Sequence, residues 1–362
     1  MESFLSLLPS ASSFGGSSCY MAPAMARGRS GSVQQMSATA TAHAADTRTV
    51  SKPTKALKRR PQPRKSRRST RKKDHGDTPS SRSTRKRDHS EYLYGLYPVL
   101  AALASQRRRF KQLWLRGGAS DEQATRPAAQ KLAALVKELQ DSGDLTTVVS
   151  GVSEEELSKL ARSSQHDGVV LAAEPLAWKD LEALPTPEPG ALWIVAEGIT
   201  DHMNLAKIVQ AAAFVQASGM VVSAKGSCSL GVHESVASAG HSEVFPFFRN
   251  RSLWSMLAEA RNAGWCIVGT GPTRLDDDLE VWPCSDIDAR LSQWCSENDA
   301  AKAVVLVLGA EGPGLSEELT QVCSALANIP GGEGDLDSLN VGVASGILLH
   351  RFRQAVGEAP AL

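Results

Sequence analysis

The chain has 362 residues, an apolar fraction of 42% and a formal net charge of +1 that hides an uneven distribution. Residues 1–90 carry 19 Lys and Arg against 5 Asp and Glu, whereas residues 91–362 carry 21 against 34. The composition supports one or two folded domains, and no apolar stretch approaches the roughly 18 residues of a membrane span. These numbers predict a basic N-terminal segment joined to an acidic globular body, with no membrane partner.

The basic segment divides into two parts. Residues 1–50 are rich in Ser and Ala and poor in acid, which is typical of an organellar transit peptide; plain disorder is the simpler alternative. Residues 51–90 form a basic, disordered arm in which "RRSTRKKDH" (67–75) recurs as "SRSTRKRDH" (81–89). This arm is either an electrostatic contact for RNA phosphates or a solvated linker, and both alternatives stay open.

Residues 91–175 predict a small α/β domain. A turn at Gly95 precedes a helix, and Ser153 with Glu156 forms a capping box before another helix. The other predicted elements are strands at 110–117, 146–150 and 168–174 and a helix at 127–143. Residues 176–190 follow as a linker, whose three prolines resist regular structure.

Residues 191–356 predict a second α/β domain with a parallel sheet covered by helices on both faces. Strands are expected at 191–198, 219–224, 243–248, 264–271 and 303–309, and helices at 204–218, 252–263, 316–327 and 340–353. Ligands of such sheets bind outside the carboxyl ends of the strands. The glycine-rich turn "LGAEGPGLS" (308–316) lies at such an end, where glycines let backbone come close to another group.

Common motifs are absent from this turn and from the rest of the chain. "GAEGPG" lacks the Lys and Ser/Thr of a P-loop and does not match GxGxxG, and neither HExxH nor GxSxG occurs. The six cysteines show no CxxC pair, which predicts reduced, mostly buried thiols and no metal. ATP hydrolysis, dinucleotide-dependent redox chemistry and zinc or serine hydrolysis are therefore disfavoured.

Polar residues stand in three loops that follow strands. Asn204 opens "NLAKIVQAA", Glu311 lies within the glycine turn, and Ser338 and Asn340 precede an apolar helix in "NIPGGEGDLDSLNVGVASGI". Each alone is explained as a helix cap. Three such loops at strand ends of one domain favour a shared site.

These three stretches resemble the motifs of the SpoU/TrmH RNA 2′-O-ribose methyltransferases of the SPOUT superfamily, over about residues 92–353. The organellar large-subunit rRNA members are the most similar. The resemblance implies an L30e-like substrate-binding domain before a catalytic domain with a trefoil knot, a homodimer, and S-adenosylmethionine as methyl donor. It also implies a cofactor pocket wrapped by backbone and lined by Gly309, Ala310, Gly312, Ile329, Pro330 and Leu339.

The catalytic residues implied by the resemblance are Asn204, Gln210, Glu311, Ser338 and Asn340. The family carries an arginine, credited with activating the hydroxyl, where this chain has Gln210, and an amide lacks an arginine's charge. Residues 225–236 also depart from the family, with Ser229, Gly231 and Val236 in place of the usual residues. Either Lys207 or another group assists, or the chain is a degenerate member that only binds RNA.

The function predicted is S-adenosylmethionine-dependent 2′-O-ribose methylation of organellar rRNA, at a guanosine of the large-subunit RNA. The main alternative is a catalytically degenerate RNA-binding or ribosome-assembly protein. A small-molecule α/β enzyme fits the sheet but explains neither the basic arm nor "SLN". The mitochondrion is the expected location, with the chloroplast as the alternative.

Overall fold

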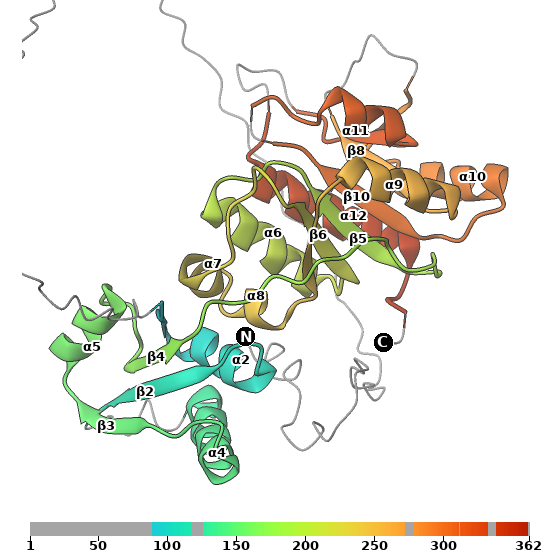
Figure 1. Cartoon of the computed structure of the whole chain (residues 1–362). Helices are drawn as coiled ribbons and strands as arrows, with labels where there is room; N and C mark the ends of the chain where they lie inside the picture. Colours follow the sequence, from blue (N-terminus) through green and yellow to red (C-terminus); the bar gives the residue numbers. More distant parts are fainter. Residues whose placement is uncertain (1–88, 118–125, 272–278, 311, 332–337, 361–362) are drawn as a thin grey trace, which may run out of the picture. The chain divides into compact units, whose positions relative to one another are not determined.

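The computed structural model describes residues 89–117, 126–271, 279–310, 312–331 and 338–360 (Figure 1). The transit peptide and most of the basic arm predicted from the sequence lie outside these residues. The described chain contains a four-stranded sheet and a seven-stranded sheet. Within this part of the chain, no helix is both long and apolar enough to cross a membrane.

The four-stranded sheet is built from residues 91–173. It has the order β1-β4-β2-β3, with β4 antiparallel to both β1 and β2, and β2 parallel to β3. The predicted capping box is present, because Glu156 N donates to Ser153 Oγ at 3.3 Å. The elements are β1 (Glu91–Tyr94), α2 (Leu96–Ser105), β2 (Phe110–Arg116), α4 (Pro127–Ser142), β3 (Val148–Val152), α5 (Glu154–Ala161) and β4 (Val169–Ala173).

The seven-stranded sheet is parallel throughout and has the order β7-β6-β5-β10-β8-β11-β9. β10 pairs with β5 on one side and β8 on the other, so a late strand lies between two earlier ones. Its strands are β5 (Leu192–Ala196), β6 (Gly219–Ser223), β7 (Phe247–Asn250), β8 (Cys266–Thr270), β9 (Val281–Pro283), β10 (Val304–Leu308) and β11 (Ala325–Asn328).

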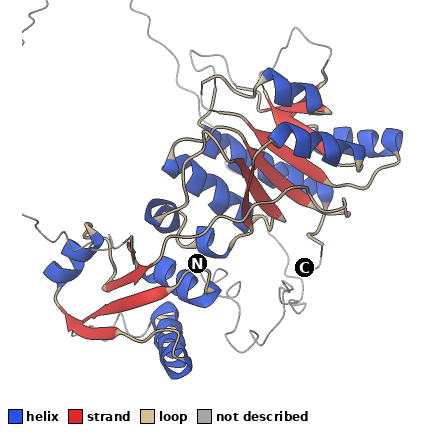
Figure 2. Ribbon diagram, in the orientation of Figure 1, coloured by secondary structure: helices blue, strands red, loops and turns tan. Residues whose placement is uncertain are grey.

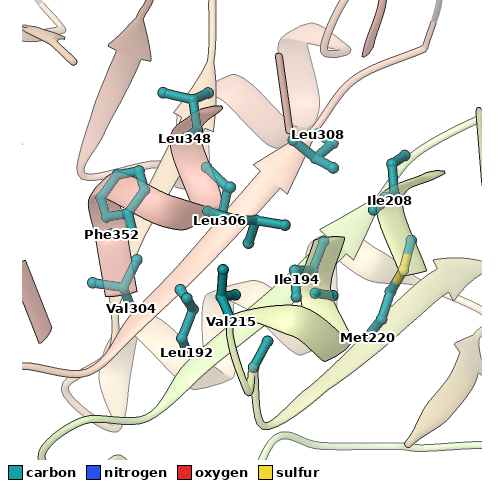
Figure 3. Packing of buried hydrophobic residues seen from close by; sticks show 14 of the residues in the cluster. Leu192, Ile194, Ile208, Val215, Met220, Val304, Leu306, Leu308, Leu348 and Phe352 are labelled. Atoms are coloured by element: carbon teal, nitrogen blue, oxygen red, sulfur yellow. The ribbon is translucent and has the colours of Figure 1, made fainter. Parts of the chain in front are cut away.

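Helices cover both faces of this sheet, as the sequence predicted (Figure 2). Alternate residues of β5 and β10 point to opposite faces, as the pleat of a strand requires. Ile194 and Leu306 pack with α6 (His202–Phe214), α10 (Ile287–Asn298) and α12 (Val341–Val356) (Figure 3). Val195 and Val305 pack with α9 (Leu253–Asn262) and α11 (Glu317–Val322) on the other face.

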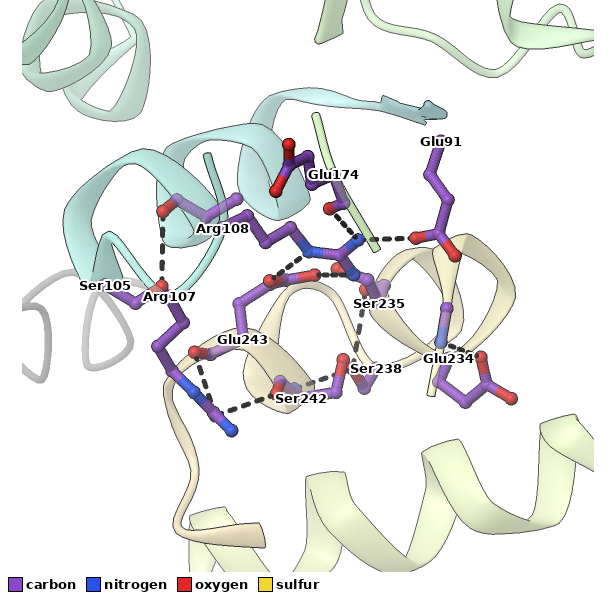
Figure 4. A network of polar contacts seen from close by, with 12 residues as sticks. Glu91, Ser105, Arg107, Arg108, Glu174, Glu234, Ser235, Ser238, Ser242 and Glu243 are labelled. Atoms are coloured by element: carbon purple, nitrogen blue, oxygen red, sulfur yellow. Dashed lines mark hydrogen bonds and ion pairs between the residues drawn. The ribbon is translucent and has the colours of Figure 1, made fainter. Parts of the chain in front are cut away.

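The strand predicted at 243–248 is wrong. Two short helices, α7 (Val232–Ala237) and α8 (His241–Val244), occupy residues 232–244, and the strand β7 begins only at Phe247. The Glu243 carboxylate is fully buried and accepts two hydrogen bonds from Arg108, at 2.9 Å from Nε and 2.8 Å from Nη2 (Figure 4). This contact to a residue 135 positions away explains why a local pattern misplaced the segment.

The helix predicted at 316–327 is too long. α11 ends at Val322, and residues Ala325–Asn328 form β11 between β8 and β9. The pairing with two neighbouring strands overrides the helical spacing of the apolar residues. The sequence also failed to predict β1, β9, α7 and α10.

Candidate active site

Three of the predicted motifs meet at the carboxyl edge of the parallel sheet. Asn204 follows β5, the glycine turn follows β10, and Ile329 follows β11. β5 and β10 are adjacent and in register, with Ala196 opposite Leu308. The loops that leave these two strands are therefore neighbours, which is the arrangement that forms ligand sites in parallel sheets.

Asn204 and Asn340 are joined directly. The Asn340 side-chain amide donates from Nδ2 to Asn204 Oδ1 at 3.0 Å, across 136 residues of sequence. Asn340 is also the N-cap of α12, where its Oδ1 accepts from Gly342 N at 3.1 Å. Both polar atoms of the Asn340 side chain are therefore engaged, and they fix the orientation of Asn204, which is only 2% exposed.

The simpler explanation of Asn204 as a helix cap is wrong. Asp201 is the N-cap of α6, and its side chain accepts from Met203 N at 2.9 Å. Asn204 lies within the first turn of the helix, and its buried amide faces Asn340. Asn340 has both predicted roles, because it is the N-cap of α12 and also contacts Asn204. Ser338 is exposed two residues before that cap.

The glycine turn after β10 closes on its own backbone. Ala310 N donates to Gly314 O and Gly314 N donates to Ala310 O, both at 3.0 Å. A Cβ added at Gly309 would lie 2.3 Å from Gly314 C and from Leu315 N. The group that approaches Gly309 closely is thus the loop itself, whereas Gly312, with φ +90°, faces open space. The predicted Glu311 lies outside the described residues.

Glu197 is a residue of this site that the sequence did not single out. It follows β5, and its Oε2 accepts from Ser316 N at 2.9 Å, which ties the far end of the glycine turn to the neighbouring strand. Glu197 N also donates to Leu308 O at 2.9 Å. The only signal in the sequence was an acid directly after a buried strand, in "WIVAEG".

The other residues predicted to bind the cofactor flank residues 332–337 in the sequence, and residues 332–337 lie outside the described part of the chain. Ile329 is partly buried against the core, and Pro330 is exposed. Leu339 is 50% exposed. Their contacts to a cofactor stay a prediction.

Gln210 is separate from the asparagine pair. It is exposed on α6 and lines a shallow surface hollow with Lys207, Phe214 and His350. Among the described residues, no hydrogen bond joins Gln210 to Asn204 or Asn340. Lys207 lies closer, since a Cβ added at Gly342 would lie 2.9 Å from Lys207 Cδ and 3.2 Å from Asn340 Oδ1.

The thiols agree with the prediction in the described part of the chain. Five cysteines there are free; Cys266, Cys295 and Cys323 are buried, and Cys228 and Cys284 are partly buried. Burial raises the pKa of the Cys323 thiol to about 12 and also raises that of Cys266. Such thiols are protonated and unreactive at neutral pH.

Two family descriptions match the chain. Residues 191–350 match the SpoU rRNA Methylase family, and residues 92–178 match the RNA 2′-O ribose methyltransferase substrate binding domain. Among curated proteins, the human protein named rRNA methyltransferase 1, mitochondrial is 32% identical over 273 residues, covering 72% of this chain and 71% of that protein. The 23S rRNA (guanosine-2′-O-)-methyltransferase RlmB of Shewanella oneidensis is 29% identical, and the match covers 72% of this chain and 95% of that protein.

Solved structures share the fold. An RNA 2′-O ribose methyltransferase gives a TM-score of 0.55 at 21% identity, covering 74% of this chain and 89% of that one. The SpoU methyltransferase AviRb of Streptomyces viridochromogenes was solved in complex with the cofactor AdoMet. It gives a TM-score of 0.53 at 19% identity, and the match covers 76% of this chain and 93% of that one.

The two family descriptions and the human relative define the class as an RNA methyltransferase. The chain belongs to the SpoU rRNA methylase family. The predicted family and enzyme class are therefore confirmed, and S-adenosylmethionine is the methyl donor of that class.

Proposed function

We propose that the chain transfers a methyl group from S-adenosylmethionine to the ribose 2′-hydroxyl of a guanosine in organellar large-subunit rRNA. The observation that carries the proposal is the Asn204–Asn340 amide pair beside the glycine turn at the carboxyl edge of the sheet. The names of the human and Shewanella oneidensis relatives support rRNA as the substrate and guanosine as the nucleoside.

The glycine turn fits a cofactor held through backbone groups. Its closed backbone leaves Gly312, Pro313 and Gly314 exposed, with open space beside Gly312. When bound, S-adenosylmethionine supplies an electrophilic methyl group on a sulfonium sulfur. The residues that would hold it are those predicted from the sequence: Gly309, Ala310, Gly312, Ile329, Pro330 and Leu339.

The protein's own contribution is to hold the ribose and help remove its hydroxyl proton. Asn204 is buried and oriented by Asn340, so its amide is preorganised for a polar substrate group. Ser338 is exposed two residues before Asn340, and we expect it to contact a second hydroxyl. Positioning of this kind supplies much of the rate of a group transfer, and general-base assistance adds about 10²–10⁴-fold.

Asn340→Ser tests the role of the asparagine pair. Serine still caps a helix, but its hydroxyl is too short to reach Asn204, so α12 stays capped while the pair is broken. We expect methyl transfer from tritiated S-adenosylmethionine into large-subunit rRNA to fall by about 10²-fold or more, with little change in melting temperature. Asn298→Ala is the control, because Asn298 bonds only locally, to Trp294 O.

Activity of Asn340→Ser equal to that of the wild-type protein would contradict the proposed site. The methylated position is mapped by its resistance to alkaline cleavage, which also identifies the nucleoside. A product at a base atom would contradict 2′-O transfer.

A degenerate RNA-binding protein is the second candidate, and Gln210 is the observation that favours it. The exposed amide cannot supply the charge of the family's arginine. Binding of rRNA and cofactor without any methyl transfer is the result this candidate predicts.

The location and the assembly complete the proposal. The mitochondrial names of the relatives support a mitochondrial address, with the chloroplast as the alternative. Fusing residues 1–90 to a fluorescent protein distinguishes the two organelles.

A homodimer is supported by an exposed apolar stripe on α6 and α12, formed by Met203, Phe214, Val343 and Ile347.

A further inference from the structure

Three potential metal ligands from different elements converge beside the start of α6. His202 is the first residue of α6, Cys228 lies in the loop after β6, and Glu234 lies in α7. Their ligand atoms, His202 Nδ1, Cys228 Sγ and a Glu234 carboxylate oxygen, all lie within 4.8 Å of one another. A tetrahedral zinc site holds such donors about 3.4–3.8 Å apart, so small side-chain adjustments would complete it.

Within the described part of the chain, no arginine or lysine forms an ion pair with the buried Glu234 carboxylate. Its side chain is 1% exposed, Oε2 accepts from Gly231 N at 2.8 Å, and Oε1 contacts His202 Nδ1. His202 is its one ion-pair partner within the described residues. A buried carboxylate is costly unless it is paired, and a divalent cation bound beside it supplies two positive charges.

The ligand chemistry selects the kind of metal. Imidazole nitrogen, thiolate sulfur and carboxylate oxygen together suit zinc, whereas magnesium and calcium prefer oxygen alone. On binding, the Cys228 S–H bond breaks, the sulfur–metal bond forms and the proton passes to solvent. The thiolate and the Glu234 carboxylate balance the two charges of the cation, which offsets the unfavourable helix dipole at the start of α6.

The surroundings hold these ligands in place. Cys228 N donates to Ile199 O at 2.9 Å, which fixes the loop beside the end of β5. The bond from Gly231 N orients the Glu234 carboxylate. Outer contacts of this type position metal ligands. Cys228 and Glu234 lie within residues 225–236, where the resemblance implies other residues. The sequence separations of 26 and 6 between the three ligands gave no metal-type spacing.

We infer that His202, Cys228 and Glu234 form a zinc(II) site with water as the fourth ligand. The bound metal fixes the first turn of α6, and Asn204 lies two residues after His202. The metal therefore supports the orientation of the asparagine pair.

Cobalt(II) and zinc(II) titrations of the full-length protein, stripped with a chelator, test this site directly. We expect one equivalent of cobalt to bind, with a thiolate-to-cobalt charge-transfer band that zinc abolishes by displacement. Cys228→Ser should lose the band and weaken zinc binding by roughly tenfold or more. Cys284→Ser, which alters another partly buried thiol, should keep both.

Two further variants separate ligand loss from misfolding. Glu234→Gln keeps an oxygen for Gly231 N, so it should fold and still lose affinity for zinc. His233→Ala removes an exposed imidazole whose ring centre is 5.9 Å from that of His202, and it should leave binding unchanged. The inference is overturned if the wild-type protein takes up no cobalt or zinc, if Cys228→Ser keeps the charge-transfer band, or if His233→Ala abolishes binding. Because metal uptake is measured without RNA or cofactor, its outcome does not depend on methyl transfer.

Discussion

At residue 210 the chain carries a neutral amide on an exposed turn of α6, at the position where the resemblance implies an arginine. The resemblance implied that this side chain acts on the ribose hydroxyl. Within one chain Gln210 lies away from the asparagine pair and beside the exposed apolar stripe, next to Phe214. A dimer formed through this stripe would bury Gln210 at the interface. The Gln210 side chain would then act on the active site of the second chain of the dimer, not on that of its own chain.

Gln210→Arg should raise the rate of methyl transfer with little change in cofactor affinity. The restored charge assists proton removal, an effect realised in the transition state and worth about 10²–10⁴-fold where general-base help is complete. The measurements are single-turnover transfer and cofactor titration calorimetry. Light scattering serves as the control, since an arginine in an apolar interface could also alter assembly. An unchanged rate in an intact dimer would contradict a catalytic role for this position.

The sequence identified single residues well where their neighbours in sequence form the motif. Asn204, Asn340 and the glycine turn were all found this way, and the structure brings the two asparagines together. Glu197 was missed because its role rests on Ser316, 119 positions away. Gly309 was predicted because a cofactor was expected to approach its backbone. In the structure, the backbone of the loop itself fills the space beside Gly309.

The glycine turn behaves as a single element, and Gly309 is its most confined residue. Gly309→Ala places a methyl group 2.3 Å from Gly314 C and Leu315 N, so the turn must open or β10 must shift. We expect a destabilisation of about 1–3 kcal/mol and weaker binding of S-adenosylmethionine. Thermal melting and calorimetry measure the two effects.

Gly331→Ala provides the matched control for stability. Gly331 is exposed, has no positive φ and has nothing within 4 Å of an added Cβ, so its melting temperature should be unchanged. If Gly309→Ala melts like the control and binds the cofactor normally, the turn does not require a glycine at position 309.

A second element-scale feature is the buried ion pair that joins the segment after α2 to α8 (Figure 4). Arg108 and Glu243 are both fully buried in their side chains, and Arg108 also contacts Glu91. Burial by itself lowers the pKa of Arg108, but Glu243 and Glu91 more than offset it, so the net pKa is raised. The guanidinium is therefore charged at every pH at which the protein folds.

Arg108→Met should destabilise the protein by about 3–5 kcal/mol, because it leaves the Glu243 carboxylate buried without a counter-charge. The double variant Arg108→Met with Glu243→Leu should be more stable than Arg108→Met alone. Chemical denaturation of the four proteins of this cycle gives the coupling energy. Arg290→Met is the control, since its pair with Glu280 is exposed and contributes about 1 kcal/mol or less. Additive effects of the two buried substitutions would contradict coupling.

Elements with strong local periodicity were predicted, and elements set by distant contacts were not. The five-residue strands β5, β6, β8 and β10 were placed within two residues at each end because they are continuously apolar. β11 and α8 were misassigned, since strand pairing and the Arg108 contact decide them. The trefoil knot and the L30e-like class of the first sheet stay predictions.

On the scale of the whole molecule, the exposed side of α6 and α12 is the feature that a single chain leaves unexplained. Phe214 is 81% exposed, Met203 51%, Val343 49% and Ile347 38%. α6 and α12 are in contact, so these residues lie on two neighbouring helices. The apolar residues of the last helix predict Val343, Ile347 and Leu348 at the dimer interface. Leu348, however, is 2% exposed and belongs to the core, so this part of the prediction is wrong. Val343 and Ile347 remain available.

The wild-type protein should be a dimer at micromolar concentration, and Phe214→Glu should make it a monomer. The substitution puts a charge on a surface that must lose water on association. Because Phe214 is exposed in the single chain, folding should stay intact. Trp254→Glu is the matched control, because Trp254 is 49% exposed on α9, which covers the other face of the sheet. Multi-angle light scattering distinguishes the states, and circular dichroism confirms that both variants fold. A wild-type monomer, or a dimer that survives Phe214→Glu but dissociates in Trp254→Glu, would move the interface away from α6 and α12.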